Sequence, residues 1–397
     1  MFTKKFLTIL LSAAALLGAA VQARAQQTED TVRITTRVVF VDALVKDKKT
    51  NQPVKNLARE NFQVLDDGKP RTLSYFATDA NRRKRPLALV VVLDMSSDAI
   101  IYLQKPEVIE SIITSLGKLQ PADEVAIMQR WYEPQPGFFT FQINSKIIEP
   151  LTRDRAKTNA ALRGAQKFAA QNWPQVKKIF SFKEMWKEEL KHPLETTVMM
   201  NDPTPPPIFT TAPDFVDALR SAPFRATLER PGSQIAIAEI SDDLDGDTLK
   251  KSRESARSLI GTGVIVSSVN VERTLMGKMI NVLGTVTSPM FRAQFHLSSY
   301  LSKQTGGITA NVGNAEDFDK AFDEIIGGLN ASYSLGFTLN ENEIADKRLH
   351  RLQVSVKARD ERGKARKLVV SARQGYCLCE TESKVATPQA SLVRPRT

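Results

Sequence analysis

LALVVVLDMSSD, residues 87–98, is an apolar run without polar alternation that ends on a carboxylate. Such a run predicts a strand buried on both faces, at the centre of a parallel sheet that helices cover. The turn after it is crowded with oxygen ligands, on Asp94, Ser96, Ser97 and Asp98. Asp and Ser are also ordinary turn and helix-cap residues, and Asp98 is placed to begin the next helix.

A second acidic turn favours a ligand site over capping alone. QIAIAEI, residues 234–240, is another apolar strand pattern, and Asp242, Asp243, Asp245 and Asp247 follow it closely. Two parallel strands of one sheet would deliver these carboxylates to the same edge, where open α/β sheets bind ligands. Clustered carboxylates and hydroxyls are typical ligands of a hard divalent cation such as Mg²⁺.

The order of the patterns predicts an α/β protein with a doubly wound, mostly parallel sheet over residues 86–330. Residues 28–80 and 333–379 alternate as antiparallel strands, with a hairpin turn at 66–69. We expect these two segments to pair into one small antiparallel β-domain, into which the α/β domain is inserted. Residues 172–213 bring aromatics and prolines, which indicates an insertion that either covers the sheet or presents a partner-binding surface.

The two ends of the chain read as processing and tail segments. Residues 1–25 combine Lys4 and Lys5, an apolar core and a small-x-small cleavage pattern, which predicts a secretory signal peptide and an exported, periplasmic or secreted protein. No other stretch is apolar enough to span a bilayer, so we expect no transmembrane span in the mature chain. Residues 380–397 are polar and are predicted to be a disordered tail.

The charge pattern argues against binding of nucleic acid, and the few cysteines and histidines limit disulfide and zinc chemistry. The formal net charge is +11, but the basic residues are spread out, and the densest cluster, at 82–85, has no interleaved aromatics. We therefore expect no nucleic-acid binding.

The 2 cysteines, Cys377 and Cys379, form either a strained local disulfide or an intermolecular one. The 3 histidines are isolated in sequence, which argues against a zinc site.

Several stretches carry a family resemblance. The turn at 94–98 and the acidic turn at Asp242 resemble the first and third loops of a von Willebrand factor type A domain. The flanking stretches resemble the VWFA-related domain proteins exported by Acidobacteria; they are VFVDALVKDKKTNQPVKNLARENFQVLDDGKP, LSKQTGG, ASYSLGF and HRLQVSV. The resemblance implies a von Willebrand factor A or Rossmann-like fold and a binding module of undefined ligand.

The resemblance also implies a metal-ion-dependent adhesion site, built from an Asp-x-Ser-x-Ser turn, a Thr on a second loop and an Asp on a third. When this site is matched to the present sequence, the resemblance implies five metal ligands, Asp94, Ser96, Asp98, Thr211 and Asp242. The implied cation is Mg²⁺, with Mn²⁺ or Ca²⁺ as alternatives. Asp98 stands where the family has Ser, and Asp243 where a Gly often follows. The added carboxylate either strengthens cation binding or marks a degenerate, empty site.

The leading interpretation is an exported, non-enzymatic protein-binding module, for adhesion or assembly, whose cation is completed by an acidic side chain of a protein partner. One alternative is a metal-independent structural scaffold of an envelope assembly. The other is a Mg²⁺-dependent hydrolase of a phosphate or an ester. No nucleophile with an adjacent His is visible in the sequence, which argues against an enzyme.

Overall fold

The computed structural model describes twelve parts of the chain. The predicted signal peptide, Ser97, Thr211, most of the predicted insertion and the C-terminal tail lie outside them. The described residues are 37–78, 85–96, 98–134, 141–179, 230, 232–243, 257, 259–272, 296–340, 343, 348–360 and 362–377.

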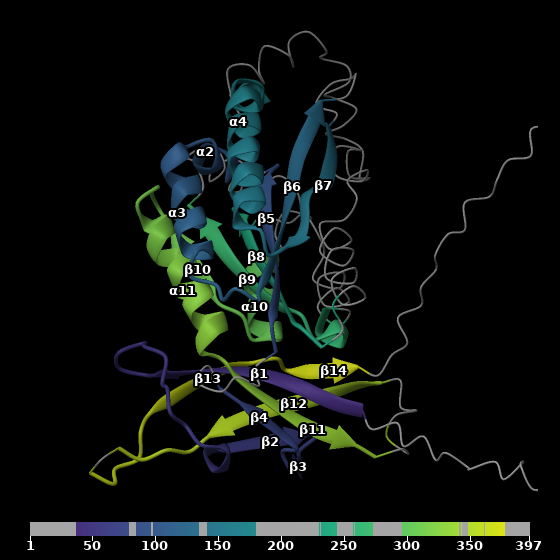
Figure 1. Cartoon of the computed structure of the whole chain (residues 1–397), viewed down its shortest axis with the longest axis vertical. Coiled ribbons are helices and arrows are strands. Elements are labelled where there is room, and N and C mark those ends of the chain that lie inside the picture. The colour runs from purple at the N-terminus through teal and green to yellow at the C-terminus, as the bar shows by residue number, and fades with distance from the viewer. Residues whose placement is uncertain are drawn as a thin grey trace, which may run out of the picture. The chain divides into compact units, whose positions relative to one another are not determined.

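A six-stranded sheet forms the centre of the α/β part, in the order β10-β9-β8-β5-β6-β7 (Figure 1). The strands are β5 (Leu87–Met95), β6 (Glu124–Pro134), β7 (Phe141–Thr152), β8 (Gln234–Ser241), β9 (Ile265–Val271) and β10 (Thr309–Val312). Strand β5 pairs in parallel with both β6 and β8, and every one of its residues is buried. Only the edge strand β7 runs antiparallel among the pairs described. The prediction of an α/β fold with a mostly parallel sheet, in which β5 is a central strand, is confirmed.

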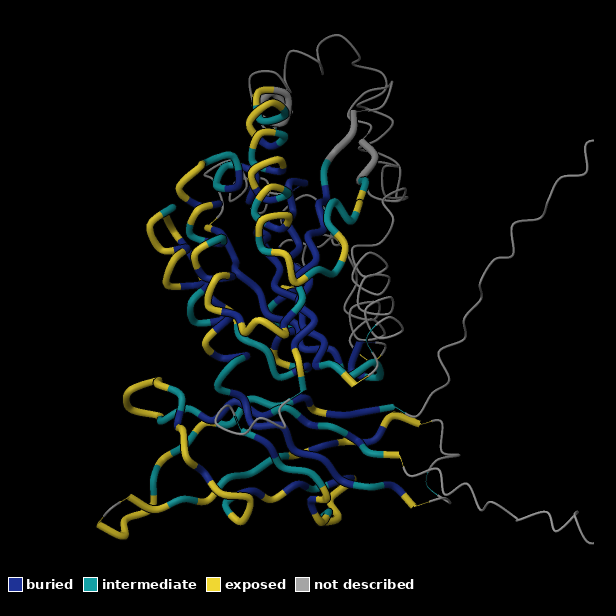
Figure 2. The backbone as a smooth tube through the Cα atoms, viewed as in Figure 1, coloured by how far each residue is buried: buried dark blue, intermediate teal, exposed yellow. Residues whose placement is uncertain are grey.

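Helices cover both faces of this sheet. They are α2 (Ile100–Leu103), α3 (Pro106–Leu116), α4 (Arg155–Ile179), α10 (Leu297–Thr305) and α11 (Asp317–Ala331). Alternate residues of β5 enter two separate apolar clusters, because successive strand side chains point to opposite faces. One cluster contains the apolar faces of α3, α4 and α11, and the other contains that of α10. Figure 2 shows the central strands as the most continuously buried part of the chain.

Asp98 does not begin a helix, contrary to the sequence-based expectation. Helix α2 has Ala99 at its N-cap and no side-chain cap. The first long helix after β5 is α3, which buries Val108, Ile109, Ile112 and Leu116. It begins at Pro106, whose fixed φ suits the first helical position. Asp98 itself lies in the turn before α2, and it is buried.

Two four-stranded sheets are built from the terminal segments, in the orders β13-β1-β11-β4 and β14-β12-β2-β3. The strands are β1 (Arg37–Asp47), β2 (Phe62–Asp66), β3 (Lys69–Arg71), β4 (Tyr75–Ala77), β11 (Tyr333–Leu339), β12 (Leu349–Val356), β13 (Leu368–Ala372) and β14 (Gly375–Cys377). Each sheet pairs N-terminal with C-terminal strands in antiparallel register. Both sheets contribute to one apolar cluster, so we call them the β-sandwich.

The hairpin between β2 and β3 adopts the predicted tight turn. Asp67 and Gly68 both have positive φ, of 49° and 81°. Two consecutive left-handed residues are the pattern of the hairpin turn that matches strand twist. The turn places the side chains of Asp66 and Asp67 beside strand β12, which pairs with β2.

None of the helices in the described ranges is long and apolar enough to cross a membrane.

Candidate functional site

The predicted site lies where β5 and β8 end. These strands are parallel neighbours with Leu93 opposite Ile240, so the turns that follow them emerge at the same edge of the sheet. Five carboxyl groups at this edge are 8% exposed or less, and we call them the acidic edge: Asp94, Asp98, Glu239, Asp242 and Asp243. Ser96 lies among them and is 6% exposed.

Asp94 has a defined partner for each of its carboxylate oxygens. Oδ1 accepts hydrogen bonds from the backbone N–H of Ser96 at 3.0 Å and from its hydroxyl at 2.5 Å. Oδ2 lies 3.3 Å from Nη1 of Arg130, which stands opposite Asp94 on β6. The structure thus places the side chains of Asp94 and Ser96 in contact, and adds a buried guanidinium that the sequence analysis missed.

Glu239 is a second residue that the sequence analysis missed. It lies inside β8 and is 1% exposed. Burial raises the pKa of Glu239 well above its ordinary value, and the nearby charge of Asp94 raises it further. A hydrogen bond from Ser298 and the charge of Arg130 act in the opposite direction. Oε2 of Glu239 has no hydrogen-bond partner among the described residues, so this buried oxygen is unsatisfied.

Asp243 stabilises the start of helix α10. Its Oδ1 accepts hydrogen bonds from the backbone N–H groups of Ser298 and Ser299, at 2.8 and 3.3 Å, and its Oδ2 accepts one from Nδ2 of Asn270 at 3.2 Å. The φ of Asp243 is 57°, in the left-handed region that glycine adopts readily. Asp243 thus adopts a backbone conformation that glycine would adopt readily. Its carboxylate, which glycine lacks, accepts hydrogen bonds at the N-terminus of α10.

The residues of the acidic edge suit a hard cation by chemistry. Five buried carboxyl groups gather there, and their ligand atoms are oxygens of the type that Mg²⁺, Mn²⁺ and Ca²⁺ bind. In the part of the chain described, however, no three of these carboxyl groups bring one oxygen each within 4.8 Å of one another. A cation here would therefore need the hydroxyl of Ser96 and bound water besides one or two carboxylates, as Mg²⁺ often does. Thr211 lies outside the described residues.

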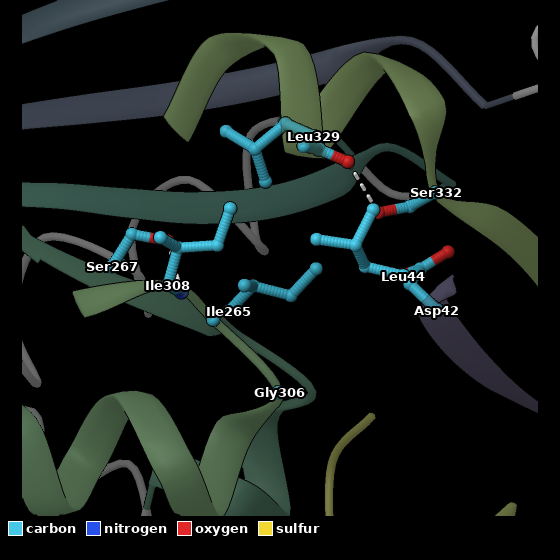
Figure 3. Close-up of a pocket in the computed structure, with 10 residues that line it drawn as sticks. Asp42, Leu44, Ile265, Ser267, Gly306, Ile308, Leu329 and Ser332 are labelled. Carbon is cyan, nitrogen blue, oxygen red and sulfur yellow. Dashed lines mark hydrogen bonds between the residues drawn. The ribbon is translucent and has the colours of Figure 1, made fainter. Parts of the chain in front are cut away.

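A small pocket elsewhere offers no comparable chemistry. Figure 3 shows its lining, where Leu44, Ile265, Ile308 and Leu329 lie beside Ser267 and Ser332. Its one carboxylate, Asp42, is already engaged: Oδ1 accepts a hydrogen bond from Ser334 at 2.5 Å, and Oδ2 pairs with Arg85 at 2.7 Å. The acidic edge remains the better candidate for binding.

Comparison with known proteins gives fold neighbours only. No protein-family model and no curated protein matches the chain. Among solved structures, the SpRpn10 VWA domain is 9% identical, with a TM-score of 0.31 over 61% of this chain and 94% of that one. A von Willebrand factor type A protein from Catenulispora acidiphila is 10% identical, with a TM-score of 0.34 over 82% and 76% of the two chains.

A third similar structure is the manganese-loaded TRAP protein of Plasmodium vivax. It is 9% identical, with a TM-score of 0.34 over 76% of this chain and 97% of that one. Because all these TM-scores are low, the strand order, the strand register and the buried carboxyl groups carry the functional argument instead.

Proposed function

We propose that this chain is a non-enzymatic protein-binding module, for adhesion or assembly, that binds its partner at the acidic edge. The observation that carries the proposal is the gathering of buried carboxyl groups where β5 and β8 end. Carboxylates buried close together repel one another, as the effect of Asp94 on the pKa of Glu239 indicates, and that repulsion is costly. A bound cation would relieve that cost and would leave a positive centre at the surface of the sheet edge.

The cation is Mg²⁺ in this proposal, with Mn²⁺ or Ca²⁺ as alternatives. Its ligands are Ser96, Asp98, Thr211 and Asp242, and Asp94 orients Ser96 through the hydrogen bond between their side chains. When bound, the cation supplies an open coordination position that an acidic side chain of a protein partner fills. Arg130 forms an ion pair with Asp94, so its positive charge offsets part of the negative charge around the cation.

The family and the cellular location are part of the same proposal. The chain is a von Willebrand factor A-like protein of the acidobacterial VWFA-related type, exported after removal of residues 1–25. The β-sandwich forms a domain of its own from residues 28–80 and 333–379, and the α/β domain of 86–330 is inserted into it. Support comes from the resembling stretches and from the pairing of N-terminal with C-terminal strands.

One observation favours a second candidate, a metal-independent scaffold. The ion pair of Arg130 with Asp94 already supplies one positive charge inside the acidic edge. If that charge is sufficient, the edge is a structural cluster and partner binding needs no cation. The two candidates differ in one measurable property, the effect of Mg²⁺ on binding.

Immobilised peptides that carry Asp or Glu, beside matched peptides with Asn or Gln, test the proposal. The expected result is retention of the chain by the acidic peptides in Mg²⁺ and release in EDTA. Ser96→Ala should abolish this retention. Ser111→Ala should not, because Ser111 is a half-buried serine of α3 whose hydroxyl donates to the backbone carbonyl of Glu107 in the same helix. Retention that is the same in EDTA and in Mg²⁺ would instead support the metal-independent scaffold.

A further inference from the structure

A second cluster of ligand-type side chains lies in the β-sandwich, apart from the acidic edge. Asp66 ends strand β2, Asp67 follows it in the hairpin turn, and His350 lies in the neighbouring strand β12. The side chains of Asp66 and His350 are 1% and 6% exposed, and that of Asp67 is 29% exposed. One ligand atom from each residue falls within 4.8 Å of the other two.

Two of the three spacings between these atoms match a first coordination shell. Nδ1 of His350 lies 3.1 Å from Oδ2 of Asp67 and 3.6 Å from Oδ1 of Asp66. Ligand atoms around a tetrahedral Zn²⁺, with bonds of about 2.0–2.1 Å, are roughly 3.3 Å apart. We propose that Asp66, Asp67 and His350 bind Zn²⁺, with water as the fourth ligand on the exposed side of Asp67.

In each carboxylate, the oxygen that would not bind the metal accepts hydrogen bonds from neighbouring groups, as the ligands of protein metal sites commonly do. Oδ2 of Asp66 accepts hydrogen bonds from Nη2 of Arg71 at 2.7 Å and from the hydroxyl of Tyr376 at 3.0 Å. Oδ1 of Asp67 accepts a hydrogen bond from the backbone N–H of Arg351 at 2.9 Å. The ring of His350 stacks on that of Tyr376, with centroids 4.6 Å apart. These contacts turn the other oxygen of each carboxylate toward Nδ1.

An independent observation points to a ligand at this place. Oδ1 of Asp66 is buried and has no hydrogen-bond partner among the described residues, although it faces Nδ1 of His350. Leaving a buried carboxylate oxygen unsatisfied is costly, and a cation between the two atoms would remove that cost.

The donor set selects zinc over the cations proposed for the acidic edge. One imidazole nitrogen with two carboxylates suits Zn²⁺, whereas Mg²⁺ and Ca²⁺ favour oxygen ligands throughout. Arg348 pairs with Oδ2 of Asp67 at 2.7 Å, but its side chain is 58% exposed. An exposed ion pair contributes little to stability, so Zn²⁺ can displace it. The bound ion would tie the β2–β3 hairpin to β12.

Calorimetric titration of Zn²⁺ into the whole chain tests this site, with metal removed beforehand and no histidine tag. Reductant is left out because Cys377 is disulfide-bonded and should not offer a thiolate. Asp67→Asn is the informative variant, since Asn tolerates the positive φ of this position and keeps the oxygen that Arg351 contacts. Asp360→Asn is the matched control, because Asp360 also accepts backbone N–H groups in an exposed turn.

The expected result is binding of one Zn²⁺ that Asp67→Asn weakens by about tenfold or more and Asp360→Asn leaves unchanged. Titration of Asp94→Ala should give the same Zn²⁺ affinity, which separates this site from the acidic edge. Co²⁺ in place of Zn²⁺ should give the visible absorption of a tetrahedral ion. Absence of Zn²⁺ binding, or equal binding by Asp67→Asn, would overturn the proposal and leave a simple ion pair between His350 and Asp67.

Discussion

The carboxylate of Asp94 at the end of β5 lies 3.3 Å from the guanidinium of Arg130 on β6, and their side chains are 8% and 7% exposed. Strand register causes this contact, because the two residues stand directly opposite each other in the parallel pair. A buried ion pair of this kind adds little net stability, but removal of one partner leaves the other charge buried and uncompensated. Arg130 therefore determines how much negative charge the acidic edge presents.

Arg130→Met should destabilise the protein in EDTA by about 3–5 kcal/mol, because the buried carboxylate of Asp94 would lose the guanidinium that pairs with it. Mg²⁺ should restore part of that loss if the acidic edge holds a cation. Urea unfolding measures both effects. Arg153→Met is the control, since the side chain of Arg153 is 64% exposed and lies 3.6 Å from Glu124. That change should cost less than about 1 kcal/mol.

Glu239→Gln should remove a pH dependence of stability. Burial, followed by the charge of Asp94, raises the folded-state pKa of Glu239 above its ordinary value of 4.5. Between these two pKa values the folded state binds the proton and the unfolded state does not, so stability falls as the pH rises through this window. The variant, which is neutral in both states, should lack that fall.

Urea unfolding at several pH values from about pH 5 to about pH 8 measures this slope. Glu110→Gln is the control, because a hydrogen bond from Arg163 lowers the pKa of Glu110 and places its effect at lower pH. The account of Glu239 is wrong if Glu239→Gln and wild type lose stability equally across this range.

Val92→Asp should unfold the α/β part of the chain. Val92 is fully buried in β5, and an ionised carboxylate there has no partner and no access to water. A loss above about 4 kcal/mol is expected, with collapse of the circular dichroism signal. Val369→Asp, at a residue of β13 that is 47% exposed, should be nearly silent.

Gly307→Ala should weaken the contact between β9 and the segment before β10. A methyl group at position 307 would overlap the backbone carbonyl of Val266, which cannot move without disturbing the sheet. Overpacking of this kind typically costs about 1–3 kcal/mol. Gly164→Ala, at an exposed position of helix α4 with open space around it, should instead stabilise by about 1 kcal/mol. Thermal melts of the two variants should therefore shift in opposite directions.

The sequence predicted the elements whose signal is local. The unbroken apolar run of β5 indicated a central parallel strand, and residues 66–69 indicated the hairpin turn between β2 and β3. In each case the residues that make the pattern are close together in the chain.

The missed features depend on contacts between distant segments. Arg130 and Glu239 are charged residues inside apolar strands, and only the strand register reveals that they meet Asp94. Asp243 caps a helix that begins far along the chain. The expectation of no zinc site rested on the isolation of His350 in sequence, whereas the pairing of β12 with β2 brings it to two carboxylates.

The central claim is that the acidic edge binds a divalent cation in the folded state. A thermal melt of the whole chain in EDTA, Mg²⁺, Mn²⁺ and Ca²⁺, run beside Asp94→Ala and Asp242→Ala, tests it most directly. A cation that binds only the folded state at about 100 times its Kd stabilises by about 2.7 kcal/mol. We predict a higher midpoint in Mg²⁺ that both substitutions abolish. An unchanged midpoint with every cation, or a shift that survives both substitutions, would contradict the claim.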